Sequence, residues 1–95
     1  IYTYCRHKYT AATIKALNQN GYEVSGVIDD SATYINTNFF GFKTINSQKF
    51  FDKIKDNIND VLVIITHQRE KTLNKIASNL INKGIKKEQI IKIKY

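Results

Sequence analysis

Three consecutive basic residues, Arg6, His7 and Lys8, stand in the opening stretch IYTYCRHKYTAAT, between a strand-like segment and a helix-like one. A helix N-terminus favours an anion, because its free backbone N–H groups and the helix dipole both act on it. Guanidinium, imidazole and ammonium groups can bind the same anion through side chains. The stretch therefore predicts a site for phosphate or a nucleotide. The alternative is a polar turn at a helix start that binds nothing.

Two carboxylates follow the next strand-like run, in the segment GVIDD, where Asp29 ends the run and Asp30 comes directly after it. In dinucleotide-binding folds, an acid about 20–25 residues after the first turn accepts hydrogen bonds from a ribose hydroxyl pair. Aspartates are also good turn and cap residues. The spacing does not choose between a ribose-binding role and a turn-forming one.

A third polar loop, THQRE, covers residues 66–70 and follows the most hydrophobic run of the chain. Thr66 or His67 could hydrogen-bond a base or a sugar, and Arg69 could bind a phosphate. Thr66 is also a good N-cap residue, and we expect it to cap the next helix. No Gly-x-Ser-x-Gly elbow and no His-Glu-x-x-His zinc motif is present. We therefore expect neither catalytic residues nor a metal site.

The single cysteine, Cys5, stands beside Arg6 and His7. Neighbouring cations could lower the pKa of its thiol and make it nucleophilic. The alternative, which we favour, is a small residue at the end of a strand. One thiol cannot form an internal disulfide, and this favours a reducing, cytoplasmic compartment.

Strand-like and helix-like segments alternate along the chain. We expect strands at 1–4, 22–28, 61–65 and 89–93, with a shorter one at 41–45, and helices at 8–20, 48–58 and 70–84. The run VLVII at 61–65 is typical of a strand covered on both faces at the centre of a parallel sheet. The alternation predicts an α/β fold, a Rossmann-like three-layer domain with a parallel sheet of four to five strands.

Side-chain patterns locate the ends and faces of the helices. Gly21 and Gly84 stand where C-terminal caps with positive φ are expected, and Ser47 is the expected N-cap of the second helix. The third helix has the clearest apolar stripe, formed by Leu73, Ile76, Ala77, Leu80 and Ile81. In such a fold, ligands bind beyond the carboxyl ends of the strands, at the point where the strand order reverses. That rule places residues 4–9, 29–33 and 66–69 around one crevice.

Length and charge limit the function classes. Ninety-five residues predict one domain, spanning 1–95, and we expect it to be a piece of a larger protein. No run of about 18 apolar residues is present, so no membrane-spanning helix is expected. The net charge is +7, which suits an anionic partner. The lysines are dispersed, however, so we favour a solvated basic surface as their explanation and expect nucleic-acid binding least.

Two segments carry a family resemblance: GYEVSGVIDDSATYINTNFFGFKTINSQKFFDKI at 21–54 and DVLVIITHQREKTLNKIASNLINKGI at 60–85. The first resembles the pattern G-Y-x-V-x-G-F-I-D-D…G…G-x-x-V/I, and the second is similar to its continuation, in the Rossmann-like N-terminal domains of bacterial surface-polysaccharide proteins. These proteins include the sugar O-acyltransferases and the CapD-type nucleotide-sugar dehydratases. The resemblance covers nearly the whole chain and implies a nucleotide-binding fold.

The first turn departs from this family. It is similar in position to G-A-G-G-H-G of the acyltransferases and G-A-G-x-x-G of the dehydratases, and His7 falls where the acyltransferases have their histidine. At residues 3–8 of this chain, every glycine of the family's turn is replaced by another residue. A β-carbon at each of these positions takes room from a pyrophosphate on the backbone. We therefore expect NAD and NADP to bind weakly or not at all, and a nucleotide-sugar such as a UDP-sugar to be the better candidate.

The resemblance implies a nucleotide- or nucleotide-sugar-binding domain of a surface-carbohydrate biosynthesis protein. The domain itself is then not catalytic, and the reaction of a sugar-modifying transferase or dehydratase lies in further domains of the same chain. The alternative is a degenerate scaffold or dimerisation module without a small-molecule ligand. Tyr4 or Tyr9 lying across the nucleotide position would favour that alternative.

Overall fold

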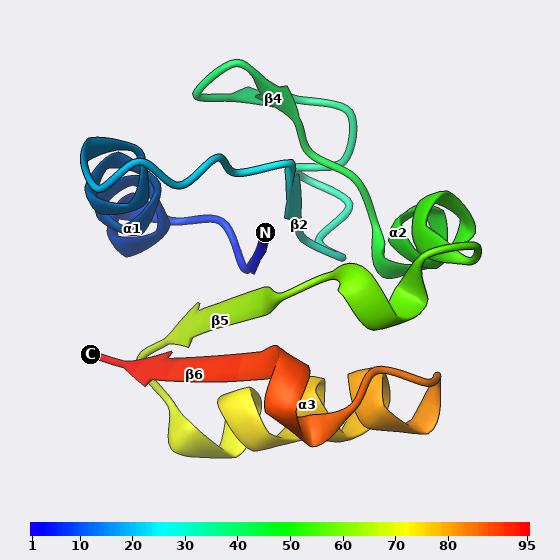
Figure 1. Ribbon diagram of the computed structural model, residues 1–95. Helices are drawn as coiled ribbons and strands as arrows, with labels where there is room; N and C mark the ends of the chain where they lie inside the picture. The colour runs from blue at the N-terminus through cyan, green and yellow to red at the C-terminus, as the bar shows by residue number, and fades with distance from the viewer.

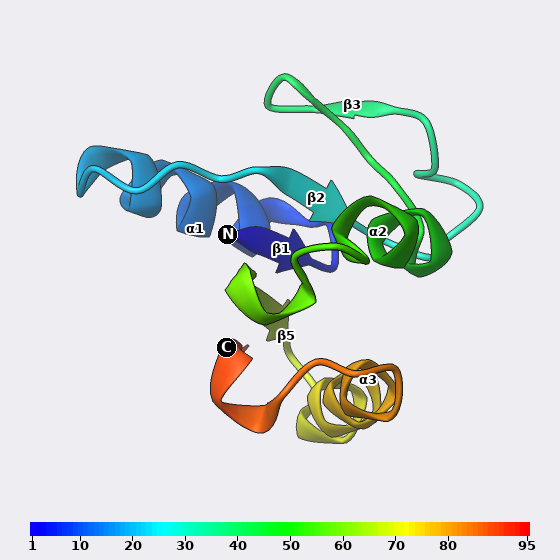
Figure 2. The same cartoon turned by 45° about the vertical axis from the view of Figure 1, so that its right-hand side comes forward.

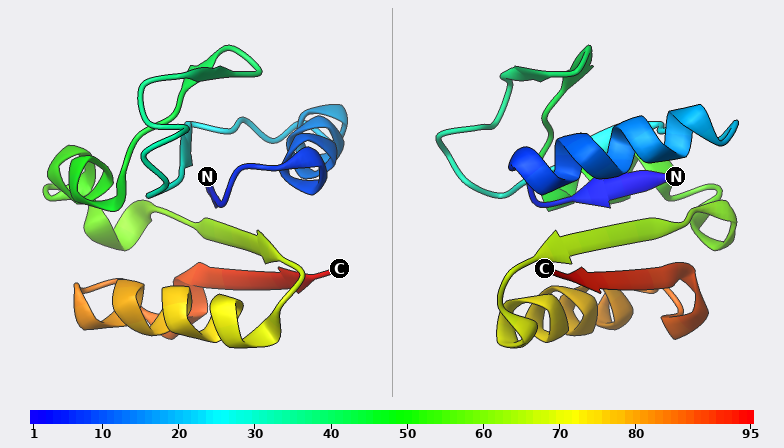
Figure 3. Two further views of the ribbon diagram at one scale, coloured as in Figure 1. Left: turned by 180° about the vertical axis from the view of Figure 1, so that it is seen from behind. Right: turned by 90° about the vertical axis from the view of Figure 1, so that its left-hand side faces the viewer.

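Four parallel strands form the sheet of this α/β domain, and the computed structural model describes residues 1–95 (Figure 1). The strands are β1 (Tyr2–Tyr4), β2 (Gly26–Ile28), β5 (Val63–His67) and β6 (Ile90–Lys94), in the order β2-β1-β5-β6. The helices are α1 (Lys8–Gln19), α2 (Ser47–Ile54) and α3 (Glu70–Asn82), with short 3₁₀ turns at Ile58–Asp60 and Lys87–Gln89. The arrows of β1, β5 and β6 point the same way in Figure 3, right, so their carboxyl ends share one edge.

The strand order reverses between β1 and β5. From β1 the chain steps outward to β2, and then crosses back to β5 and on to β6. Right-handed crossovers in opposite directions place their helices on opposite faces of the sheet. Accordingly, α1 lies on one side of β1 and β2, with α2 on the other side (Figure 1) and α3 against β5 and β6. The predicted α/β class, the central pairing of the first strand with 61–65 and the helices on both faces are confirmed.

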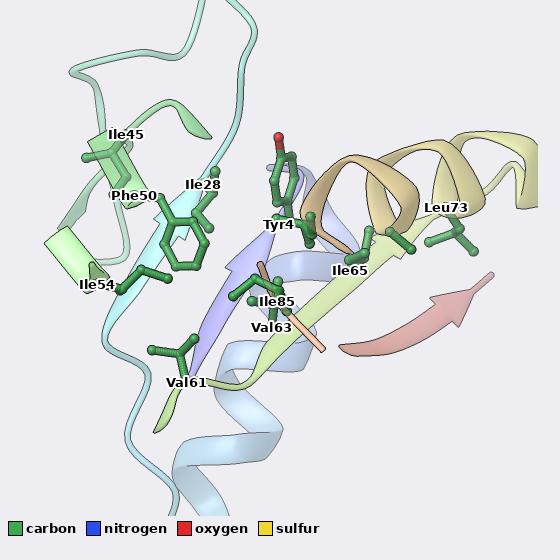
Figure 4. Close-up of a cluster of buried hydrophobic side chains, with 12 residues drawn as sticks. Tyr4, Ile28, Ile45, Phe50, Ile54, Val61, Val63, Ile65, Leu73 and Ile85 are labelled. Atoms are coloured by element: carbon green, nitrogen blue, oxygen red, sulfur yellow. The ribbon is translucent and has the colours of Figure 1, made fainter. Parts of the chain in front are cut away.

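The larger core lies on the α2 and α3 face (Figure 4). Its largest fully buried side chains include Phe50 and Ile54 of α2, Ile28 of β2, and Leu80 of α3. Strand β5 is buried on both faces, because Val63 and Ile65 point into this core while Ile64, at 4% exposure, points to the opposite side. This burial is the physical basis of the uninterrupted apolar run in the sequence.

A two-stranded hairpin follows β2; its second strand lies within the short strand expected at 41–45, whereas its first strand was not predicted. Its strands are β3 (Asn38–Phe39) and β4 (Phe42–Lys43), and Figure 2 shows it above β2, on the side away from α3. Phe39 and Phe42 pack against a second, smaller core of Ile14, Val24 and Val27 under α1. After the hairpin, the backbone at Ile45 pairs in parallel with Ile28, so it covers the outer edge of β2.

Several predicted boundaries are wrong. The second strand was expected to start at residue 22 but starts at Gly26, which pairs with Tyr2 of β1. Asn46, not Ser47, is the N-cap of α2, because its side chain accepts a hydrogen bond from the Lys49 N–H at 2.8 Å. That helix ends at Ile54, and a 3₁₀ turn then holds Ile58.

The third helix follows its predicted stripe except at one position. Leu73, Ala77 and Leu80 are buried, whereas Ile81 is 43% exposed and lies outside the core. Both glycine caps are confirmed, with φ of 83° at Gly21 and 110° at Gly84.

Candidate functional site

The turn between β1 and α1 is formed by Cys5, Arg6 and His7 alone, since the flanking residues belong to the strand and the helix. Cys5 has a φ of 77°, a left-handed conformation that glycine adopts freely and other residues rarely do. Its backbone N–H donates to the Ile28 carbonyl at 2.9 Å, which extends the pairing of β1 with β2. The turn therefore keeps a glycine-like backbone without a glycine.

His7 is the N-cap of α1, and its imidazole occupies the helix start. Nδ1 accepts a hydrogen bond from the Tyr9 N–H at 3.2 Å, and Nε2 lies 3.0 Å from the Thr66 carbonyl oxygen. The hydroxyl of Tyr95, at the end of β6, also contacts this ring. The histidine thus uses a donor that a phosphate would otherwise find at the N-terminus of α1, and it ties three strand ends together.

Arg6 points away from the helix start, toward the second loop. Its guanidinium donates to the Thr37 hydroxyl and, at 3.1 Å, to the Asn38 carbonyl. The same group lies over the rings of Tyr34 and Phe39, 4.7 and 4.8 Å from their centroids. The three consecutive basic side chains therefore do not converge, and Arg6 instead holds the hairpin against the turn.

Both aspartates accept hydrogen bonds that fix the backbone near the carboxyl ends of β1 and β2. The Asp29 carboxylate accepts hydrogen bonds from the backbone N–H groups of Arg6 and Ser31, each at 2.8 Å. Asp30 accepts from the Tyr4 hydroxyl and, at 2.7 Å, from the Ser47 N–H at the start of α2. Of the two roles left open by the sequence, this geometry matches the turn-forming one.

Thr66 does not cap the third helix, and that prediction is wrong. It lies within β5, is fully buried, and its hydroxyl pairs with the Thr10 hydroxyl at 3.0 Å. The N-cap position of α3 is held by Arg69 without a side-chain hydrogen bond. Instead, the His67 Nδ1 accepts from the Arg69 N–H at 3.0 Å. Partial burial lowers the pKa of His67, and the nearby imidazole of His7 lowers it further.

A cavity of about 250 Å³ lies at the carboxyl edge of the sheet, beside the point where the strand order reverses. The side chains that line it are His7, Lys8, Tyr9, His67, Gln68 and Tyr95. The rings of Tyr9 and Tyr95 stack with centroids 3.7 Å apart and planes inclined by 30°, and the Lys8 ammonium lies 5.2 Å from the Tyr9 ring centroid. His7, Lys8 and His67 are therefore brought together, so two of the three loops expected around one crevice, 4–9 and 66–69, line the cavity, while 29–33 does not.

Of the lining residues, Gln68 lies in the predicted loop 66–69 without having been singled out, and Tyr95 was missed in the sequence. Tyr95 comes directly after the last strand, and parallel strands end at the same edge of a sheet. The place of Tyr95 directly after the last expected strand could therefore have identified it as a residue near this edge. Arg6, Asp29, Asp30, Thr66 and Arg69 do not line this cavity.

The thiol of Cys5 is not activated. Burial raises its pKa to about 12, and the charges of Asp29 and Asp30 raise it further in the same direction. The hypothesis of a nucleophilic cysteine with a lowered pKa is therefore wrong, because burial and two carboxylates act on the thiol, while the Arg6 guanidinium binds Thr37 and Asn38 instead.

No family model matches this chain, and neither does any curated protein or solved structure. No three His, Cys, Asp or Glu side chains are grouped so that they could hold a metal ion. None of the helices combines the length and the apolar character needed to cross a bilayer.

Proposed function

We propose that this chain is a Rossmann-like, non-catalytic domain that binds a nucleotide or nucleotide-sugar in the cavity at the strand-order reversal. One observation carries the proposal: the cavity is lined by two imidazoles, one ammonium and two aromatic rings, with no carboxylate among them. Such a lining suits a ligand that combines an aromatic base with phosphate groups. Its position is also where open parallel sheets bind their ligands.

In this proposal, a charged side chain of the lining binds the phosphate and the aromatic rings bind the base. The Lys8 ammonium, which is exposed at the mouth, would bind a phosphate oxygen as a flexible point charge. An outer ring face of the Tyr9–Tyr95 stack would take the base, a contact worth about 1–3 kcal/mol per base in single-stranded nucleic-acid sites. The backbone cradle of dinucleotide-binding turns has no counterpart, since the His7 side chain already accepts from the Tyr9 N–H. This is the reason to favour a UDP-sugar over NAD.

The biosynthetic context is also part of the proposal. It rests on the resemblance of 21–54 and 60–85 to the N-terminal domains of surface-polysaccharide proteins, in which another domain performs the chemistry. A cytoplasmic location and further domains in the same polypeptide follow from that context.

A second function is favoured by a specific observation. The stacked rings of Tyr9 and Tyr95 lie against His7, at the start of α1, where a nucleotide would be expected to bind. In this second function the domain is a scaffold without a small-molecule ligand, and the stack is a packing feature that joins β6 to α1.

Calorimetric titration separates the two functions. UDP, UDP-N-acetylglucosamine, inorganic phosphate and NAD are titrated at low salt into the wild-type chain, into Lys8→Ala and into Lys15→Ala. Lys15 is the matched control, because it is an exposed lysine of the same helix outside the cavity. We expect Lys8→Ala to weaken UDP binding about tenfold, or about 1.4 kcal/mol, and Lys15→Ala to leave it unchanged. Absence of binding by all four ligands would leave the scaffold function.

A further inference from the structure

A second cavity lies between α2 and α3, on the face of the sheet that holds the larger core. Its volume is about 350 Å³, and it shares no lining residue with the cavity at the strand-order reversal. Tyr4 of β1 reaches this cavity from the core, where it is 7% exposed. In Figure 4 its ring stands beside α3, with the hydroxyl pointing away from β1. The core therefore presents a polar group to this cavity.

A hydrogen-bonded group lies at one end of the cavity. The Tyr4 hydroxyl donates to one oxygen of the Asp30 carboxylate, and the other oxygen accepts from the Ser47 N–H at 2.7 Å. Burial raises the pKa of Tyr4, and the bond to Asp30 raises it further, so the phenol keeps its proton. An ionised carboxylate has about four acceptor positions, of which these two bonds use two. The exposed Asp30 carboxylate can therefore still accept from hydroxyl groups of a ligand.

The other end of the cavity carries a donor and an aromatic ring. The Lys83 ammonium, at the end of α3, lies 5.5 Å from the centroid of the Phe51 ring of α2, and both residues line the cavity. Asn79, one helical turn before Lys83, adds a side-chain amide that both donates and accepts. Leu80 adds apolar surface beside the ring. This end therefore combines hydrogen-bond donors with an apolar wall.

The lining indicates the chemical class of the ligand. Its two charged groups, Asp30 and Lys83, have opposite signs, so the lining favours neither an anion nor a cation. Asp30 only accepts and Lys83 only donates, whereas a hydroxyl group does both and can pair with either. Ser47, beside Asp30, and Phe51, beside Lys83, are one turn of α2 apart, about 6 Å. The two charges of an amino acid lie closer together, so this spacing suits a polyol better than a small zwitterion.

We propose that the cavity between α2 and α3 binds a neutral, polyhydroxylated ligand of the size of one sugar ring. Hydroxyls at one end of the ligand donate to Asp30, and those at the other end accept from Lys83 and Asn79. The C–H face of the ring lies on Phe51. The volume is near the lower limit of small-molecule sites, about 300–1,000 Å³, which suits one ring rather than a chain of them. This site is separate from the proposed nucleotide site, because the two cavities have no residue in common.

The test is an NMR titration of the ¹⁵N-labelled chain, which detects the millimolar affinities expected for so small a ligand. The neutral probes are glucose, N-acetylglucosamine and myo-inositol, and the charged probes are glucosamine and glucuronate. Each probe is titrated into wild type, Asn79→Ala and Asn74→Ala. Asn74 is the matched control, because it is an exposed asparagine of α3 outside the cavity. Alanine is the better helix former, so neither substitution weakens α3 through helix propensity.

We expect at least one neutral probe to cause saturable shifts at the amides of residues 47, 51, 79 and 83, with a Kd of about 1 mM. Asn79→Ala should weaken this binding about fivefold, the loss of one neutral hydrogen bond, and Asn74→Ala should leave it unchanged. Glucosamine and glucuronate should both bind more weakly than the best neutral probe, because each carries a charge that one end of the cavity repels.

Three results would overturn the proposal. The first is an absence of saturable shifts with every neutral probe, or equal binding by wild type and Asn79→Ala. The second is tighter binding of glucosamine or glucuronate than of any neutral probe, which would assign the cavity to a charged ligand. The third is a set of shifts at His7, His67 and Tyr95 without shifts at residues 47 and 79, which would place the sugar in the other cavity. None of these results bears on UDP binding, which the calorimetric titration measures separately.

Discussion

Cys5 stands where the backbone has the conformation of a glycine, and replacing it isolates the cost of that conformation. Its φ is 77°, while the side chain packs partly into the larger core. Comparison of Cys5→Gly with wild type would mix relief of the backbone with loss of the thiol. Comparison of Cys5→Gly with Cys5→Ala removes the thiol in both and changes only the β-carbon.

The expected difference follows from two opposing terms. A β-carbon in the left-handed region costs about 1–2 kcal/mol. Glycine, in turn, gives the unfolded chain more freedom than alanine, which disfavours folding by about 0.4–1 kcal/mol. The net expectation is that Cys5→Gly is more stable than Cys5→Ala by about 1 kcal/mol, or about 4–8 °C in Tm for a domain of this size.

Urea unfolding followed by circular dichroism measures the difference. The matched control is Ala12→Gly, at an exposed position inside α1. There the same loss of a β-carbon should lower stability by about 1 kcal/mol, because helical backbone offers glycine no relief. Cys5→Gly being no more stable than Cys5→Ala would refute the assignment of a strained turn.

Three other measurements address different parts of the domain. The buried hydroxyls of Thr3 and Thr44 have no hydrogen-bond partner, so Thr3→Val and Thr44→Val should each raise the free energy of unfolding by about 1 kcal/mol; a loss of stability in both would show that the hydroxyls are paired. Phe40 and Gly41, between β3 and β4, have φ of 52° and 83°, a conformation that Asn-Gly favours in such turns. Phe40→Asn should therefore raise the free energy of unfolding in urea by about 0.5–1 kcal/mol. Destabilisation would mean that the exposed phenylalanine ring contributes more to stability than the turn conformation costs. The folded state favours the neutral thiol of Cys5, so the contribution of this thiol to the free energy of unfolding is complete below about pH 9 and is lost as the pH rises toward about 12. Cys5→Ala should therefore reduce the fall of stability with pH over that range. Identical pH profiles of wild type and variant would contradict the raised pKa.

Much of the fold was predictable because its signals are local. The apolar run at 61–65 marked a strand buried on both faces, and the stripe on Leu73, Ala77 and Leu80 marked a helix on that sheet. Glycines at 21 and 84 marked helix ends, since each needs a positive φ. Hydrophobic periodicity and backbone freedom are properties of a few neighbouring residues, so they can be read along the chain.

The second hairpin strand lies within the strand expected at 41–45, but the first hairpin strand, at 38–39, and the short β2 could not be read in this way. The hairpin turn uses Phe40 at positive φ, and no propensity favours a bulky residue there. Its strands exist because Phe39 and Phe42 pack under α1. Strand β2 is defined by its pairing with β1, from Tyr2↔Gly26 to Tyr4↔Ile28, which joins segments more than 20 residues apart.

The candidate site shows the same division between local and long-range information. The sequence by itself determined that three polar loops meet at one edge of the sheet, because strand and helix alternation fixes which strand ends share that edge. It also determined that the first turn lacks glycine. Only the tertiary structure decided which side chains face one another there. Arg6 turns to Thr37 and Asn38, while Tyr95 reaches His7 across 88 positions of sequence separation. Such directions depend on rotamers and contacts between distant segments, and no local pattern encodes them.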